Sequence, residues 1–436
     1  MDPIALLMLT FFVLIALRVE IAFALALSSL LIIVVEDLPL ISSLNQMYSG
    51  IDSFPLLAVP FFMFLGRILN DSGITDRLLA VADASVGHIR GGLGHVNVFV
   101  SMIFASLSGS AAADTASVGA IIIPAMKKAG YDPAFSVALT AASSTLGVII
   151  PPSIILVIYG AFGNVSIGAL FWGGFVPGIL IGLAMMVYTY ILALKHGYPA
   201  NERASARTFA KAAWRGSLPL LIPVLILGGV TGGVFTPTEA AIIAVAWAML
   251  LAFVVYRSVS IRALPRMLGE AVIDFAIPLF TVASASIFGW LISFLGAADL
   301  VVNAITSLTD SSFGLMALLV FFLLIIGTFL NPISAILIFL PIIQQLGAEA
   351  GVDPVQLGVI TIMSLAIGLV TPPYGVCLLI AAQIGGISVQ RALIAILPIC
   401  AITVGIILLC ILVPDIILGL PKLMMPQVFG LAGSGT

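Results

Sequence analysis

The sequence is a succession of apolar stretches, each about twenty residues long, separated by short clusters of charge. Backbone polar groups inside a bilayer must be satisfied within the protein, and stretches of this length do so as transmembrane helices. Charged residues make up 8% of the chain, whereas a soluble domain carries about 25%. This composition excludes a soluble enzyme, a disordered chain and a nucleic-acid-binding protein.

Motifs of the first half recur in the second half at a spacing of about 221 residues. The recurring residues are glycines, prolines and aspartates at the ends of apolar stretches: Gly130, Asp132, Pro133, Gly147, Pro151 and Pro152 match Gly351, Asp353, Pro354, Gly368, Pro372 and Pro373. An ordered series of this kind indicates an internal repeat, with units of roughly 54–194 and 275–418.

The two copies differ in charge. The first carries Lys127-Lys128 where the second carries Gln344-Gln345, and no Lys or Arg occurs between Arg266 and Arg391. Because Lys and Arg concentrate in cytoplasmic loops, we predict that the two copies have opposite orientations in the membrane. Of the 16 Lys and Arg residues, this orientation leaves only Lys422 outside, and it places both termini in the periplasm.

We predict an all-α polytopic membrane protein of about ten transmembrane helices plus two re-entrant helical hairpins in two inverted-topology repeats. Amphipathic arms are expected at 76–90 and 299–310. The predicted units run along the chain as follows: an N-terminal scaffold hairpin and outer loop (1–53), a first repeat (54–194) with hairpin 94–126 and broken helix 134–163, central scaffold helices and cytoplasmic loops (195–270), a second repeat (271–418) with hairpin 313–348 and broken helix 356–385, and a C-terminal tail (419–436).

Four breaks interrupt the helical pattern at membrane depth: two hairpin tips, 108–115 and 327–332, and two interrupted passes, 143–152 and 364–373. Proline strands the carbonyl four residues earlier, which is that of Gly147 for Pro151 and that of Gly368 for Pro372. A stranded carbonyl in hydrocarbon needs a partner, and a hard cation such as Na⁺ is one. Two Na⁺ sites are therefore our hypothesis, and helix N-termini at the tips favour an anionic substrate.

Structural interpretations stay open beside this one. Proline kinks are common in membrane helices, and Ser and Thr hydroxyls often bond to their own helix. Asp114 either ligates an ion or caps a helix. Thr236-Pro237-Thr238-Glu239 fits a capping box, and Asp132 and Asp353 fit helix starts. The histidines and cysteines show no metal-ligand or disulfide spacing: His88, His95, His196, Cys377, Cys400 and Cys410.

These motifs resemble the large membrane subunit of the tripartite ATP-independent periplasmic (TRAP) transporters, the DctM-like proteins. The similarity covers nearly the whole chain. It rests on two runs, the first from Ser108 through Asp114-Thr115 to Pro151-Pro152, and the second the central segment 233–240, Gly-Val-Phe-Thr-Pro-Thr-Glu-Ala.

The resemblance implies an elevator-type secondary transporter of the ion-transporter superfamily in the bacterial inner membrane. It implies Na⁺-coupled uptake of an organic acid such as sialic acid, a C4-dicarboxylate or a sugar acid, with two or more Na⁺ ions. It also implies two protein partners, a small four-helix membrane subunit and a periplasmic substrate-binding protein, besides membrane lipid.

The resemblance also implies three sets of site residues. The first Na⁺ site would use Ser108, Ser110, Asp114, Ser144, Thr145 and Gly147. The second would use Gly327, Asn331, Ser364, Gly368 and Thr371. The substrate would lie between the hairpin tips, against Ser110, Thr115, Pro151, Pro152, Thr328, Pro372 and Pro373.

Three other functions fit the sequence less well. A self-sufficient Na⁺/carboxylate symporter of the same superfamily is the alternative, and the central segment 233–240 argues against it. An enzyme is not expected, because Asp114 has no acid–base or nucleophilic partner at depth. Paired ion sites favour coupled transport over a passive channel. The sequence names neither the acid, nor the Na⁺ stoichiometry, nor the oligomeric state.

Overall fold

The computed structural model describes residues 2–430, and every regular element in that range is a helix. Eight helical segments are long and apolar enough to cross a membrane, and shorter apolar helices pack among them. The prediction of an all-α polytopic membrane protein is confirmed.

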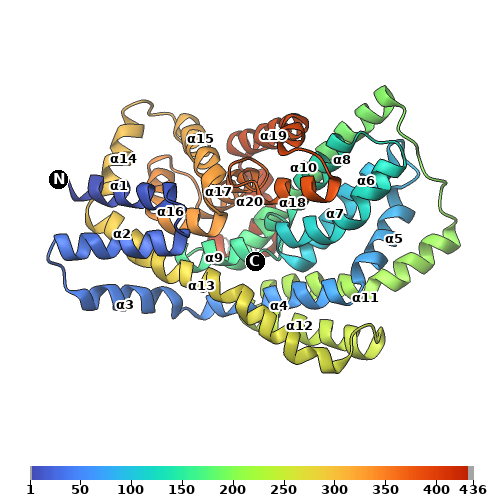
Figure 1. Ribbon diagram of the computed structural model, residues 1–436, viewed down its shortest axis with the longest axis horizontal. Helices are drawn as coiled ribbons and strands as arrows, with labels where there is room; N and C mark the ends of the chain where they lie inside the picture. Colours follow the sequence, from blue (N-terminus) through green and yellow to red (C-terminus); the bar gives the residue numbers. More distant parts are fainter. Residues whose placement is uncertain (1, 431–436) are drawn as a thin grey trace.

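The helices form two packed groups (Figure 1). The first lies along the left and lower sides of the view and contains α1 (Pro3–Ala16), α2 (Ile21–Val35), α3 (Leu40–Ile51), α4 (Ala58–Asp71), α11 (Ala206–Thr231), α12 (Pro237–Met249) and α13 (Leu264–Phe294). Within it, α13 packs on α2, α3 and α4, and α12 packs on α4.

The second group has two sets of five helices in the same order. The first set is α6 (Gly92–Ser108), α7 (Ala111–Lys128), α8 (Pro133–Ser144), α9 (Ile154–Gly163) and α10 (Ile167–His196). The second set is α15 (Ser312–Phe329), α16 (Pro332–Glu349), α17 (Pro354–Gly368), α18 (Val376–Gly385) and α19 (Val389–Leu412). Two short helices lead from the first group into these sets, α5 (Ile74–Val86) and α14 (Ala297–Thr306).

Helix starts follow the local chemistry of the sequence. Asp132 caps α8 by accepting from the backbone N–H of Ala134 (2.6 Å), and Asp353 caps α17 in the same way through Val355 (2.8 Å). A capping box opens α12 between Thr236 and Glu239. These starts confirm the structural interpretation of all three motifs.

The two sets are tied to each other by matched hydrogen bonds. The Lys127 ammonium at the end of α7 donates to the carbonyl of Gly385, the last residue of α18 (2.7 Å). The Gln344 amide near the end of α16 donates to the carbonyl of Gly163, the last residue of α9 (2.9 Å). The last carbonyls of a helix have no hydrogen-bond partner in the helix. Each set therefore provides a donor for a helix end of the other set. Figure 1 shows α7 and α18 side by side, although they are far apart in sequence.

The structure corrects the predicted units in three places. The predicted outer loop contains α3, which is amphipathic rather than uniformly apolar. The predicted central cytoplasmic loops include the first turns of a helix, because α11 begins at Ala206. The C-terminal segment includes α20 (Asp415–Met424), which packs on α10 and α17 and is therefore part of the folded unit. The rest of the predicted C-terminal tail, residues 431–436, lies outside the described residues.

The docking of α20 can be tested at Ile417, which is fully buried and faces Gly173 of α10. We expect Ile417→Ala to leave a cavity there and to lower stability by about 2 kcal/mol or more. Thermal unfolding of the purified protein, followed by intrinsic fluorescence, measures this. Leu423→Ala on the same helix is the control, because Leu423 is 72% exposed. Equal melting temperatures for the two variants would contradict a docked α20.

Candidate functional site

The first hairpin tip, between α6 and α7, sits against the break between α8 and α9. A Cβ placed on Gly147 would lie 3.3 Å from the backbone nitrogen of Ala111, and one on Gly109 would lie 3.1 Å from the Pro152 carbonyl oxygen. The predicted residues Ser108, Ser110, Ser144, Thr145 and Gly147 therefore come together around one junction. Backbone contacts backbone there, which explains why glycine stands at both positions.

The second hairpin tip, between α15 and α16, meets the break between α17 and α18 in the same way. The backbone of Gly327 touches that of Gly368 so closely that a Cβ on Gly368 would overlap the Gly327 carbonyl. The backbone N–H of Tyr374 donates to the carbonyl of Thr328 (2.8 Å) and fastens the tip to the break. Gly147 and Gly368, matched in sequence, thus hold matched contacts.

Asp114 lies in the first turn of α7 and is fully buried. Asp114 accepts no hydrogen bond from the backbone at the start of its helix, and it forms no ion pair with any described residue. The helix is capped instead by Ser110, whose hydroxyl accepts from the backbone N–H of Ala113 (3.4 Å). The capping interpretation of Asp114 is therefore wrong, and the charge of its buried carboxylate has no cationic partner among the described residues.

The oxygens around Asp114 are of the kind that a hard cation binds. The hydroxyls of Ser101 and Ser144 lie beside its carboxylate. Ser144 and Thr145 use their hydrogens within the chain, donating to the carbonyls of Thr140 (2.8 Å) and Ala142 (2.7 Å). A hydroxyl that has donated its hydrogen presents only lone pairs to the remaining space. The junction can therefore offer oxygen ligands to Na⁺.

The second predicted Na⁺ site is more fully paired. The Asn331 side chain accepts from the backbone N–H of Ser334 (2.9 Å) and caps α16. Ser364 and Thr371 donate to the α17 carbonyls of Ile360 (2.7 Å) and Ile367 (2.8 Å), Ser364 from within the helix and Thr371 from the turn that follows it. The Gly368 carbonyl, which the sequence predicts to be stranded, accepts from the backbone N–H of Thr371 (3.2 Å). The prediction of a stranded Gly368 carbonyl is therefore wrong, because the chain turns tightly after α17 and brings the Thr371 N–H to this oxygen.

A cavity of about 620 Å³ lies between the two tips and the first helix group. Its volume is within the range of about 300–1,000 Å³ that small-molecule sites occupy. Both tips and both breaks contribute to the wall: residues 108–113, Val148, Ile154, Ile155, 331–333, Leu369, Tyr374 and Val376.

Of the predicted substrate contacts, only Ser110 lines this cavity. Thr115, Pro151 and Pro152 are buried, and Thr328, Pro372 and Pro373 also lie outside its wall. The reason is geometric. The proline pairs form the crossovers between half-helices, and the residues that flank each crossover face the cavity instead.

The sequence analysis missed the opposite wall, which α4 and α13 supply: Val59, Met63, Gly66, Arg67, Asn70, Asp71, Asp274, Ile277, Pro278 and Thr281. The Arg67 guanidinium pairs there with Glu270 and with Asp274 (2.6 Å), which joins α4 to α13. Arg67 lies within the candidate membrane span Phe54–Asp71, and an ionisable residue within a span is a recognisable functional signal.

The first residues of four helices line the cavity: Ala111 of α7, Ile154 of α9, Pro332 of α16 and Val376 of α18. Each helix N-terminus carries backbone N–H groups without helical partners and a partial positive charge. Four such ends around one cavity form an environment for a negatively charged group.

Discontinuous helices meeting at a ligand-sized cavity inside a helical membrane protein define a membrane transporter. A family model described as "Tripartite ATP-independent periplasmic transporter, DctM component" matches residues 8–416. The chain belongs to this family.

Similar proteins of known name are also large permease proteins of this transporter family. The chain is 38% identical to the sialic acid TRAP transporter large permease protein SiaM of Vibrio cholerae, over 87% of this chain and 89% of that one. It is 36% identical to the C4-dicarboxylate TRAP transporter large permease protein DctM of Pseudomonas aeruginosa, over 86% and 88%. Its fold is similar to the crystal structure of the Alcanivorax borkumensis YdaH transporter, with a TM-score of 0.60 and 15% identity over 86% of this chain and 87% of that one.

The contact between Gly368 and Gly327 gives a test of the junction. We expect Gly368→Ala to force the second tip away from the break and to lower both transport and melting temperature, at a cost of about 1–3 kcal/mol or more. Gly405→Ala in α19 is the control, because a Cβ there meets open space. A Gly368→Ala protein that melts and transports like the control would contradict this packing.

Proposed function

We propose that the chain carries a small organic acid inward across the bacterial inner membrane, together with Na⁺, as the large subunit of a tripartite system. The observation that supports this best is the convergence of four helix N-termini on the cavity. Backbone N–H groups bind a carboxylate without carrying a full charge, so they favour an anion and still allow its release.

The proposed coupling ion is Na⁺ at the Asp114 junction. The support is a fully buried carboxylate that forms no ion pair with any described residue and lies beside the Ser144 hydroxyl, whose hydrogen already goes to the Thr140 carbonyl. Hard cations select oxygen ligands of this kind. A Na⁺ ion there would neutralise Asp114 and add positive charge beside the cavity, so Na⁺ and the acid would each favour binding of the other.

The second proposed Na⁺ site lies at the other tip, where Asn331 stands in place of a carboxylate. Its side chains already have partners within the chain, so binding there would rely on the second lone pairs of carbonyl, amide and hydroxyl oxygens. We therefore propose that this site is the weaker of the two.

The proposed mechanism is an elevator movement. The group of α6–α10 and α15–α20 would slide as one body against the group of α1–α4 and α11–α13, with α5 and α14 as connecting arms. The support is the placement of the cavity between these two groups and the cross-set hydrogen bonds that hold the moving body together. In the proposed topology the two repeats are inverted and both termini are periplasmic.

The proposed partners are a small four-helix membrane subunit and a periplasmic binding protein that delivers the acid. The support is the family, whose members include large permease proteins of sialic acid and C4-dicarboxylate systems. Both of those named substrates are carboxylic acids, which suits the N-terminal ends around the cavity.

Uptake into proteoliposomes under an inward Na⁺ gradient tests the proposal. The chain is reconstituted alone, then with the small subunit, then also with the binding protein, using labelled sialic acid and succinate. We expect uptake only in the complete system, and its loss when K⁺ replaces Na⁺. Uptake by the chain alone would instead indicate a self-sufficient symporter, and uptake in K⁺ would refute the coupling.

The role of Asp114 is tested by Asp114→Asn, which keeps the shape and removes the charge. We expect the apparent affinity for Na⁺ in uptake to fall by about ten-fold or more, because the one carboxylate of the site is lost. Asp353→Asn is the matched control, since asparagine caps a helix as well as aspartate does. An unchanged Na⁺ dependence in Asp114→Asn would remove this residue from the site.

A further inference from the structure

A row of hydroxyls runs along α8, one on each turn, from the Asp114 junction toward the start of the helix. Ser144, Thr140 and Ser136 are all fully buried. Each donates to the carbonyl four residues earlier, at 2.8, 2.8 and 3.0 Å, and the last of these carbonyls belongs to Asp132. Residues four apart lie on one face of a helix, so the three oxygens form a line with their hydrogens already used.

α6 faces this row with polar groups of its own. The Asn97 amide donates to the Thr140 hydroxyl (2.7 Å), and the Ser143 hydroxyl donates to that of Ser101 (3.2 Å). The carbonyl oxygen of the Asn97 side chain is buried and has no donor. In the described part of the chain, the interface between α6, α7 and α8 thus holds an unpaired amide oxygen and the buried Asp114 carboxylate, which forms no ion pair. A cation is the ligand that satisfies an excess of acceptors.

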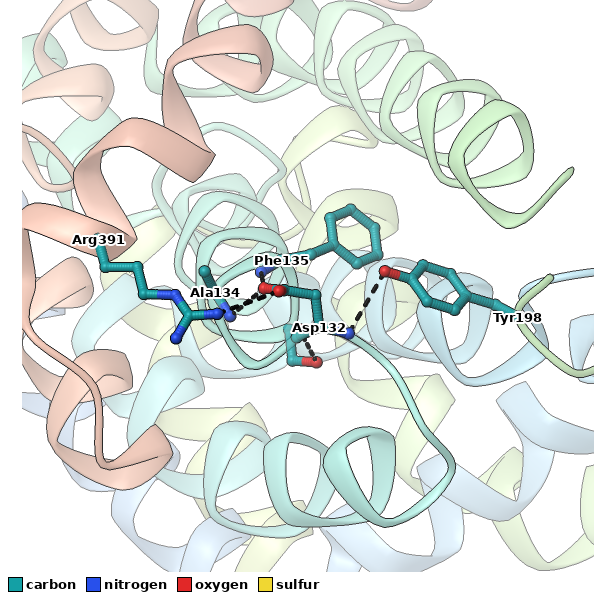
Figure 2. A network of polar contacts seen from close by, with 6 residues as sticks. Asp132, Ala134, Phe135, Tyr198 and Arg391 are labelled. Carbon is teal, nitrogen blue, oxygen red and sulfur yellow. Dashed lines mark hydrogen bonds and ion pairs between the residues drawn. The ribbon is translucent and has the colours of Figure 1, made fainter. Parts of the chain in front are cut away.

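The row ends at the surface. Asp132 precedes α8, and its carboxylate pairs with Arg391 of α19 (3.2 Å), while its backbone N–H donates to the Tyr198 hydroxyl (3.3 Å), as Figure 2 shows. The Asp132 side chain is 47% exposed. From Ser144 to Asp132 the row covers about 18 Å, at 1.5 Å per residue, with oxygens about 6 Å apart. The row thus connects the buried carboxylate of Asp114 with the exposed carboxylate of Asp132.

The second set of helices has no such row. At the spacing of 221 residues, Ser136, Thr140 and Ser144 correspond to Leu357, Thr361 and Leu365. The facing helix α15 buries Met316, Leu319, Val320 and Leu323. The two sets share the helical architecture, so packing alone does not require the hydroxyls. The full row of three occurs only in the set that contains Asp114, and the second set keeps a single hydroxyl of the three, that of Thr361.

We propose that this row is the path by which the coupling cation leaves the Asp114 site, and that Asn97 and Thr140 form an intermediate cation-binding station on it. The inference rests on the proposed Na⁺ coupling and adds where the ion goes. A Na⁺ ion moving from Asp114 would exchange carboxylate and hydroxyl oxygens for the Asn97 carbonyl and Thr140 hydroxyl, one helical turn away. From there it would reach Asp132 and the solution, on the side that the charge pattern assigns to the cytoplasm.

Net uptake and exchange separate this role from a structural one. Net uptake requires Na⁺ release in every cycle, whereas exchange of labelled for unlabelled acid with saturating Na⁺ on both sides does not. The complete system is reconstituted with Asn97→Leu or Thr140→Val, and transport is followed with labelled sialic acid or succinate, whichever the unmodified protein takes up. We expect net uptake to fall about ten-fold and exchange to stay near that of the unmodified protein.

Thr361→Val is the matched control, because it removes the corresponding hydroxyl from the second set. We expect it to change neither readout. Unaltered net uptake in both Asn97→Leu and Thr140→Val would overturn the path, and so would an equal loss of uptake and exchange, which indicates damage to the fold. If uptake by the unmodified protein did not depend on Na⁺, the proposed coupling would be overturned, and the path with it.

Discussion

The structure depends on one constraint, that a helix interrupted inside a membrane must pair its broken backbone within the protein. Here each break is closed by a hairpin tip and by its own crossover. The Ser153 hydroxyl donates to the Val148 carbonyl (2.7 Å) across the first break, and the Cys377 backbone N–H donates to the Leu369 carbonyl (2.9 Å) across the second. Because the tips must approach the backbone to complete this pairing, both junctions need glycine, and the helix N-termini they create face the same space.

A single arrangement therefore produces both proposed binding functions. The N-terminal ends that point into the cavity suit an anion, and the hydroxyls behind them suit a cation. Asp114 lies between these two environments, in the first turn of α7. The two tips are alike in backbone contact and differ in side chains, so the symmetry of the fold does not extend to its charges. This asymmetry is what a transporter with one strong and one weak cation site would need.

Local features of the fold could be predicted from the sequence, and features that depend on long-range packing could not. Helix starts are indicated by Asp132, Asp353 and Thr236, because each side chain caps its helix by a hydrogen bond to a backbone N–H two or three residues away. The proline pairs indicate the two breaks. The sequence predicts a loop where α3 lies, because its serines, Asn45 and Gln46 interrupt the apolar pattern, although they do so on one face only.

The cavity wall is the clearest case of the second kind. The role of Arg67 could not be predicted, since its partners Glu270 and Asp274 lie about two hundred residues away and meet it only where α4 crosses α13. The stranded carbonyl of Gly368 was predicted from proline chemistry, but the tight turn at Thr371 pairs it.

The crossed bonds from Lys127 to Gly385 and from Gln344 to Gly163 have a consequence for how such a chain could have arisen. Each half completes a helix end that belongs to the other, so the halves are related to each other as two subunits of an obligate dimer are. An ancestor with a single half would have had to pair with a second copy of itself to provide hydrogen-bond donors for these helix ends. Substitutions of the donor side chains, Lys127 and Gln344, would then be constrained by helix ends that lie 258 and 181 residues away in the sequence.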